Sequence, residues 1–218
     1  MWVKICGWRT AEMVADALSR AHEAGSLPDA IGLNFYDGSP RCVDVETAQK
    51  IVGQLPEGVE AVGLFVDHSV EEVCLIAEMC GLETLQLHGD YPAEEIGPLA
   101  RYRLIRVYRL ADESLDEIRR DLEECSAWGI APWACLVEAR VEGAHGGTGV
   151  LGPWNLLKDW PSDFPPLILA GGLTPENVAT AIAEVRPWGV DTASGVEEVR
   201  GDKHPDLVRT FVTRARAE

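Results

Sequence analysis

Short apolar segments alternate along the chain with longer amphipathic ones. The short segments are rich in Val, Ile and Leu, which is typical of strands covered on both faces. They span Trp2–Cys6, Ala30–Phe35, Glu60–Val66, Thr84–His88, Leu104–Tyr108, Ala134–Glu138, Leu167–Ala170 and Gly189–Ala193. Helical periodicity predicts helices over Ala11–Ala24, Val43–Leu55, Val70–Cys80, Ala93–Ala100, Glu113–Glu124, Trp154–Lys158, Pro175–Val185 and Asp206–Ala215.

Two of the predicted helices have recognisable start signals. Ser69-Val70-Glu71-Glu72 fits a capping box, in which a serine and a glutamate satisfy each other's backbone donors. Thr174-Pro175 places a capping hydroxyl before a proline at the first helical position. Both signals support the assignment of strands and helices.

Eight strand–helix units in 218 residues predict an α/β fold, a single (β/α)8 TIM barrel with one domain over residues 1–218. An open doubly wound sheet is the competing architecture. That sheet needs a glycine fingerprint after its first strand, and Cys6-Gly7-Trp8-Arg9-Thr10 is not one.

Charge and composition narrow the classes of partner. The 19 Lys and Arg residues against 36 Asp and Glu residues give a formal net charge of −17, which disfavours nucleic acids and anionic membranes as partners. No apolar run has the roughly 18–20 residues of a membrane span, and the N-terminus lacks the features of a signal peptide, so we expect a cytoplasmic protein. The six cysteines form no C-x-x-C pair and the five histidines show no zinc-ligand spacing, so neither a disulfide framework nor a metal site is expected.

In a TIM barrel the chemistry takes place at the C-terminal ends of the strands, and two glycine-containing loops lie there. Gly171-Gly172 follows the seventh predicted strand, and Ser194-Gly195 follows the eighth. Small residues before a helix N-terminus let backbone N–H groups approach an anion, and these two loops often hold phosphate in this fold. The alternative is that the glycines only form tight turns.

Four further residues follow strands at the same end of the barrel. Cys6 and Lys4 share one face of their strand, so Cys6 lies at the mouth if both side chains point into the barrel. There Cys6 is a candidate base or nucleophile, or alternatively a buried structural thiol. Glu138 ends the sixth strand before a loop with Gly146-Gly147-Thr148-Gly149, and it is a general-acid candidate or a solvated rim charge. His88 and Arg41 are candidate substrate-binding residues, or alternatively a core histidine and a surface arginine.

Taken together, these motifs resemble the phosphoribosylanthranilate isomerase family nearly end to end. The resemblance rests on Lys4-Ile5-Cys6-Gly7, Ser39-Pro40-Arg41, Leu64-Phe65-Val66, Gln86-Leu87-His88-Gly89, Gly146-Gly147-Thr148-Gly149, Leu169-Ala170-Gly171-Gly172-Leu173, Asn177-Val178 and Ser194-Gly195-Val196-Glu197. Their order, and their placement at the ends of successive strands, make the signal specific.

The resemblance implies an Amadori rearrangement in tryptophan biosynthesis. A general acid opens the furanose ring of N-(5-phosphoribosyl)anthranilate to a Schiff base, and a general base removes the C2 proton. The resemblance makes Cys6 the base and Arg41 the residue that binds the anthranilate carboxylate. It makes the loops with Gly171, Gly172, Ser194 and Gly195 the phosphate site, and it implies no metal and no organic cofactor.

The chain departs from the family pattern at several positions. The family's general acid is an aspartate, whereas this chain has Glu138, one methylene longer. A shift of about 1 Å in catalytic geometry can reduce a rate roughly a hundredfold. Trp8 replaces an aliphatic residue beside the Cys6 motif and is expected to reshape the pocket; Pro153 and His204 stand where the family tends to have aspartate.

Three other functions remain open from the sequence. An isomerase could act on another aminated sugar phosphate, with Glu138 and Trp8 as its support. A metal-dependent pentose-phosphate epimerase needs several His and Asp ligands at strand ends, where only His88 qualifies. The third alternative is a non-catalytic barrel that binds a phosphosugar. The presence of both Cys6 and a carboxylate at position 138 argues against it. The expected partner in the preferred interpretation is a small phosphorylated substrate, bound by a monomer or a homodimer.

Overall fold

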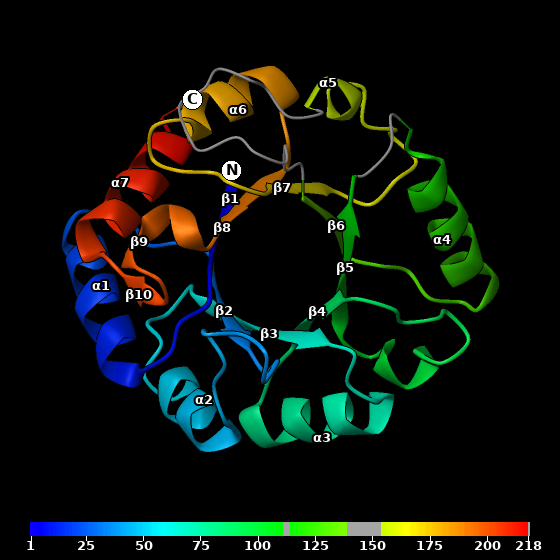
Figure 1. Cartoon of the computed structure of the whole chain (residues 1–218), viewed down its shortest axis with the longest axis horizontal. Helices are drawn as coiled ribbons and strands as arrows, with labels where there is room; N and C mark the ends of the chain where they lie inside the picture. The colour runs from blue at the N-terminus through cyan, green and yellow to red at the C-terminus, as the bar shows by residue number, and fades with distance from the viewer. Residues whose placement is uncertain (111–113, 139–153, 218) are drawn as a thin grey trace.

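The eight predicted strands form a closed parallel barrel in the computed structural model, which describes residues 1–110, 114–138 and 154–217. The order around the barrel follows the chain, and β8 pairs with β1 to close it (Figure 1). The strands are β1 (Trp2–Cys6), β2 (Ala30–Asn34), β3 (Glu60–Val66), β4 (Thr84–His88), β5 (Arg103–Arg109), β6 (Ala134–Glu138), β7 (Leu167–Ala170) and β8 (Gly189–Thr192). The predicted TIM barrel is therefore confirmed, and the open sheet is wrong.

Helices surround the barrel on its outer side (Figure 1). They are α1 (Ala11–Glu23), α2 (Val45–Val52), α3 (Val70–Cys80), α4 (Asp116–Ala127), α5 (Trp154–Leu157), α6 (Val178–Val185) and α7 (Pro205–Ala215). The capping box predicted at Ser69 is present before α3, since Ser69 and Glu72 exchange side-chain and backbone hydrogen bonds. Within the described ranges, no helix is long and apolar enough to cross a membrane.

Several predicted helices differ in extent from those of the structure, and the reason is visible for two of them. The segment Ala93–Ala100 forms only the 3₁₀ turn η1 (Gly97–Leu99), because Pro98 removes a backbone donor and Gly97 is a poor helix former. Helix α6 begins at Val178 rather than at Pro175. The Asn177 side chain instead stabilises the preceding turn, accepting a hydrogen bond from the Thr174 N–H at 2.8 Å.

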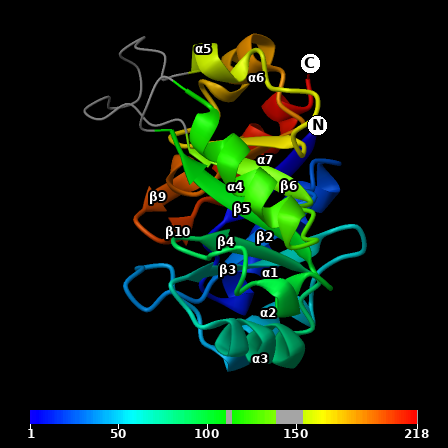
Figure 2. The same cartoon turned by 90° about the vertical axis from the view of Figure 1, so that its right-hand side faces the viewer.

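A small hairpin after β8 was not predicted. The 3₁₀ turn η2 (Ser194–Val196) leads into β9 (Glu197–Val199), which pairs with β10 (Asp202–Lys203) in an antiparallel arrangement. Both strands are too short to give a periodic pattern in the sequence. The hairpin lies outside the barrel wall, beside the end of the barrel at which β8 finishes (Figures 1 and 2).

The core has two layers. Side chains that point outward from the strands, such as Val3 and Ile5, pack against the helices in one large apolar cluster. Side chains that point inward form a smaller cluster of Ala30, Val62, Ile105, Ala134, Leu136, Ile168 and Ala170. This inner cluster fills part of the barrel, as in other barrels of eight strands.

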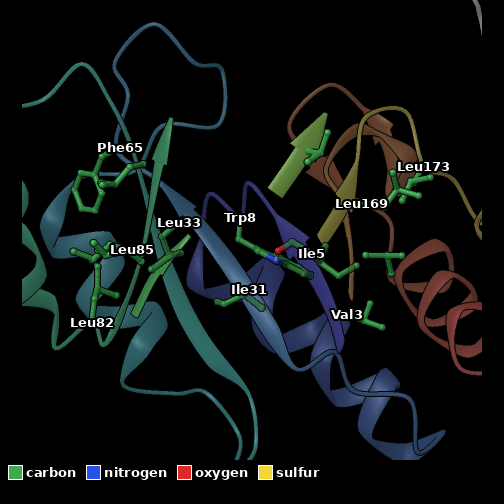
Figure 3. Close-up of a cluster of buried hydrophobic side chains, with 14 of the residues drawn as sticks. Val3, Ile5, Trp8, Ile31, Leu33, Phe65, Leu82, Leu85, Leu169 and Leu173 are labelled. Atoms are coloured by element: carbon green, nitrogen blue, oxygen red, sulfur yellow. Dashed lines mark hydrogen bonds between the residues drawn. The ribbon is translucent and has the colours of Figure 1, made fainter. Parts of the chain in front are cut away.

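Trp8 belongs to the outer layer, not to the mouth of the barrel. Its side chain is fully buried in the large cluster near Ile5 and Ile31 (Figure 3). Its indole N–H donates to the Ile5 carbonyl oxygen at 2.8 Å. The expectation that Trp8 reshapes the pocket was therefore wrong, because the chain turns after Gly7 and directs the indole away from the barrel axis.

Candidate active site

All eight strands run in the same direction, so their C-terminal ends meet at one mouth (Figure 2). Cys6, His88 and Glu138 are the last residues of β1, β4 and β6. The fold thus places these three predicted site residues around one opening. The loop with Gly146-Gly147-Thr148-Gly149, one of the motifs on which the family resemblance rests, lies outside the described residues, as does Pro153.

Cys6 is buried against the neighbouring strand, and a glycine makes room for it. A Cβ atom added at Gly32 would lie 2.6 Å from the Cys6 Sγ, so no side chain fits at position 32. Cys6 as a whole residue keeps an exposed fraction of 6%. Burial raises the pKa of the Cys6 thiol, and the ammonium groups of Lys4 and Lys203 act in the opposite direction.

A buried ion pair lies below Cys6. Lys4 is fully buried, and its Nζ donates to the Asp191 Oδ1 at 2.7 Å. Burial disfavours the ammonium form, but Asp191 and Cys6 together raise the pKa of Lys4 above its ordinary value. The predicted inward direction of Lys4 and Cys6 is confirmed, whereas the pairing with Asp191 was missed because it depends on barrel closure between β1 and β8.

Glu138, the last residue of β6, is linked to His88 through Arg109. The Arg109 Nε donates to the Glu138 Oε2 at 3.3 Å, and the Arg109 Nη2 donates to the His88 Nε2 at 2.9 Å. Because an arginine only donates, the Nε2 of His88 acts as an acceptor and the imidazole is neutral. Burial lowers the pKa of His88, which favours the same neutral form. Arg109, at the end of β5, had not been identified from the sequence.

Arg41 is held by a carboxylate of the chain. Its Nε and Nη2 donate to the two carboxylate oxygens of Glu197 at 2.6 and 2.7 Å. Glu197 also accepts from the Nζ of Lys203 at 2.6 Å. Burial opposes ionisation of Glu197, but hydrogen bonds from Arg41 and Lys203 lower the pKa of this carboxyl to about 2. Arg41 was predicted as a binding residue, whereas the roles of Glu197 and Lys203 were not predicted.

The two glycine-containing loops after β7 and β8 are in direct contact. Gly171 and Gly172 both have positive φ angles, +94° and +70°, which disfavour any other residue. A Cβ atom added at Gly195 would lie 1.8 Å from the Leu173 carbonyl oxygen. That carbonyl also accepts from the Thr192 hydroxyl at 2.7 Å. The structure therefore brings the predicted phosphate-binding loops together at the mouth.

Polar groups thus gather on two sides of the opening. Cys6, Lys4, Asp191, Arg41, Glu197 and Lys203 come from β1, β8, the loop after β2 and the β9–β10 hairpin. His88, Arg109 and Glu138 come from β4, β5 and β6. One side offers a thiol next to cations, and the other offers a carboxyl group next to a neutral imidazole. Such a pair of sites suits transfer of protons to and from a bound anion.

Comparisons with known proteins agree on one family. The family model for N-(5'phosphoribosyl)anthranilate (PRA) isomerase matches residues 3–214. An N-(5'-phosphoribosyl)anthranilate isomerase from Geotalea uraniireducens is 44% identical over 215 residues, which cover 98% of each chain.

Solved structures give the same result. A crystal structure of monomers generated from the dimeric phosphoribosylanthranilate isomerase of Thermotoga maritima is 32% identical, covers 100% of both chains and has a TM-score of 0.78. A phosphoribosyl anthranilate isomerase in complex with reduced 1-(o-carboxyphenylamino)-1-deoxyribulose 5-phosphate is 33% identical, also covers 100% of both chains and has a TM-score of 0.79.

Proposed function

We infer the function of this chain from one premise: it belongs to the N-(5'-phosphoribosyl)anthranilate isomerase family. It is an isomerase of tryptophan biosynthesis that converts the phosphorylated substrate N-(5-phosphoribosyl)anthranilate into 1-(2-carboxyphenylamino)-1-deoxyribulose 5-phosphate. The observation that carries this conclusion is the family match over residues 3–214, on a barrel whose strand ends carry Cys6 and Glu138.

The first chemical step that we propose is ring opening with Glu138 as the general acid. The protonated carboxyl gives its proton to the ring oxygen, the bond from that oxygen to C1 breaks, and the nitrogen lone pair forms the C1=N bond. Glu138 receives the Arg109 hydrogen bond on Oε2, whereas its Oε1 makes no hydrogen bond with any described residue. Oε1 is thus the oxygen available to the substrate.

The second step is removal of the C2 proton, for which we propose Cys6 in its thiolate form. The C2–H electrons form the C1=C2 bond, and the C1=N electron pair returns to nitrogen. The enol hydroxyl then loses its proton while C1 gains one, which leaves the ketone. Lys4 and Lys203 are the cations that favour a thiolate at this buried position.

The two ends of the substrate require separate anion sites in this proposal. Arg41 takes the anthranilate carboxylate with Nη1, which makes no hydrogen bond with any described residue. The phosphate binds at Gly171, Gly172, Ser194 and Gly195, whose loops touch each other. The neutral imidazole of His88 contacts the substrate beside Glu138. Local donors of this kind offset the repulsion of an anion by a chain with a net charge of −17.

Three further proposals complete the assignment. The chain acts as one domain over residues 1–218, because the barrel uses strands from both ends of the sequence. It works in the cytoplasm, which is the expected compartment of an amino-acid biosynthetic enzyme. It is a monomer or a homodimer, and sedimentation equilibrium distinguishes the two.

Genetic complementation tests the proposed function. A bacterial host that lacks its own phosphoribosylanthranilate isomerase needs tryptophan in the medium, and this chain should restore growth without it. The isosteric variant Glu138→Gln, expressed at an equal level, should not restore growth. Failure of the wild-type chain, when it is expressed in folded form, contradicts the assignment. Growth with Glu138→Gln contradicts only the role of Glu138.

A further inference from the structure

Three charged side chains, linked by ion pairs, connect two loops at the mouth of the barrel. Arg41 follows β2, Glu197 begins β9 and Lys203 ends β10. Glu197 binds Arg41 through both carboxylate oxygens at 2.6 and 2.7 Å and binds the Lys203 Nζ at 2.6 Å. The exposed fractions of the side chains are 17% for Arg41, 4% for Glu197 and 0% for Lys203. This group, the Arg41–Glu197–Lys203 triad, is therefore mostly removed from water.

Lys203 connects the triad to the loop that contains Ser194 and Gly195. Its Nζ also donates to the Ala193 carbonyl oxygen at 2.9 Å, immediately before Ser194. One ammonium group thus holds both the start of the predicted phosphate loop and the carboxylate that orients Arg41. Movement of either loop would break a hydrogen bond to Lys203 or to Glu197.

The position of the Arg41 side chain, on its way to Glu197, also requires a glycine at position 7. A Cβ atom added at Gly7 would lie 2.3 Å from the Cδ of Arg41, so the arginine crosses the β1 loop where no side chain projects. Paired Nε and Nη2 contacts fix the plane of a guanidinium, because two parallel hydrogen bonds leave it little rotational freedom. The Nη1 of Arg41 is thereby held at a set position.

The charge of the triad favours a bound anion. Two cations and one carboxylate leave one positive charge in excess in a poorly hydrated place. Both cations lie close enough to Cys6 to interact electrostatically with its thiol, so the excess charge lies at the mouth. The triad therefore keeps a net positive charge after its own members have neutralised each other, and this charge attracts an anion.

We propose that Glu197 and Lys203 are positioning residues that hold Arg41 and the Ser194–Gly195 loop as one unit, and that this unit selects substrates with a carboxylate and a phosphate at a fixed separation. The proposal rests on the proposed function, in which Arg41 binds the carboxylate and the loop binds phosphate. Neither residue contacts the substrate in this account. Each acts through the groups that it holds.

Steady-state kinetics of two variants test the proposal. Glu197→Gln keeps the shape of the side chain but removes its charge, and Lys203→Met keeps most of its volume. Both should raise KM for N-(5-phosphoribosyl)anthranilate by about tenfold to a hundredfold, where each tenfold step corresponds to about 1.4 kcal/mol of lost binding. The change in kcat should be smaller, because contacts made equally in the ground state and the transition state affect KM alone. Both should also weaken competitive inhibition by inorganic phosphate alone and by anthranilate alone.

Asp202→Asn is the matched control. It breaks an ion pair of the same hairpin, Arg9 Nη2 to Asp202 Oδ1 at 2.6 Å, whose side chains are 37% and 52% exposed. The control should leave KM and both inhibition constants within about twofold, since exposed pairs contribute little. If Lys203→Met does not fold, the isosteric Glu197→Gln decides alone.

Two results overturn the proposal. One is wild-type KM in a folded Glu197→Gln variant. The other is weaker binding of only one of the two inhibitors, which would mean that the two anion sites are independent. Failure of the proposed function is seen separately, because the wild-type chain would then show no turnover of N-(5-phosphoribosyl)anthranilate.

Discussion

Replacing Glu197 with glutamine should destabilise the folded chain by an amount that depends on pH. The carboxyl group titrates near 4.5 in its ordinary state, and the hydrogen bonds from Arg41 and Lys203 lower its pKa to about 2 in the fold, against the effect of burial. At 1.36 kcal/mol per pKa unit, this difference corresponds to about 3 kcal/mol of stability at pH 7. Truncating one member of a buried ion pair typically costs about 3–5 kcal/mol, which agrees.

The sign of the pH dependence follows from the lowered pKa. A carboxyl group with a lower pKa in the folded state stabilises the protein above its unfolded pKa, and this contribution is lost as the pH falls from about 4.5 towards about 2. The stability difference between the wild type and Glu197→Gln should therefore fall from about 3 kcal/mol at pH 7 to about half of that at pH 3.

Urea unfolding at pH 7 and pH 3, followed by fluorescence of the seven tryptophans and by circular dichroism, measures this difference. Glu198→Gln is the control, because Glu198 is the exposed neighbour on the same strand. It should change stability by less than about 0.5 kcal/mol, as surface substitutions usually do. A difference for Glu197→Gln that stays below about 0.5 kcal/mol at pH 7, or that is equal at both pH values, would mean that the Glu197 carboxylate does not stabilise the fold through Arg41 and Lys203.

Three further substitutions test other parts of the site. Cys6→Ser should lower kcat by roughly 10²–10⁴, the usual loss on removing a general base, and should change stability little because the two side chains have nearly the same size. Near-normal turnover would mean that Cys6 has only a structural role. Glu138→Gln should lower kcat by roughly the same 10²–10⁴, while the affinity for a reduced product analogue should stay unchanged. Full activity of this variant would exclude Glu138 as the general acid. Lys4→Met should cost about 3–5 kcal/mol in urea unfolding because it leaves the Asp191 carboxylate buried without a cation, and Lys4→Met combined with Asp191→Leu should regain most of this loss. Equal losses in the single and the double variant would mean that the unpaired Asp191 carboxylate is not the cause.

The parts of the structure that local sequence patterns determine could be predicted. The strands of the barrel follow from short Val-, Ile- and Leu-rich segments, and the alternation of side chains along β1 placed Lys4 and Cys6 inside. The glycine-containing loops after β7 and β8 were recognised because small residues occur directly after strands. These features depend on neighbouring residues in the chain.

The contacts that were missed join residues far apart in the chain. Arg41 and Glu197 are separated by 156 positions, and Lys4 and Asp191 by 187. A single sequence gives no signal for such pairs, since each charged residue could equally face solvent. Trp8 was misplaced for a related reason: its nearness to Cys6 in the chain says nothing about the side of the barrel wall to which the backbone directs the indole.

Turnover of N-(5-phosphoribosyl)anthranilate by the purified chain is the direct test of the isomerase activity and of the roles of Cys6 and Glu138. The substrate is made immediately before use, and the loss of its anthranilate-type fluorescence is followed at pH 7 for the wild type and for Cys6→Ser with Glu138→Gln combined. The wild-type chain should show rapid, saturable loss of fluorescence, and the double variant should show a rate close to that of buffer. A wild-type rate equal to that of buffer would contradict the isomerase activity, and equal rates for the wild type and the double variant would contradict the roles of Cys6 and Glu138.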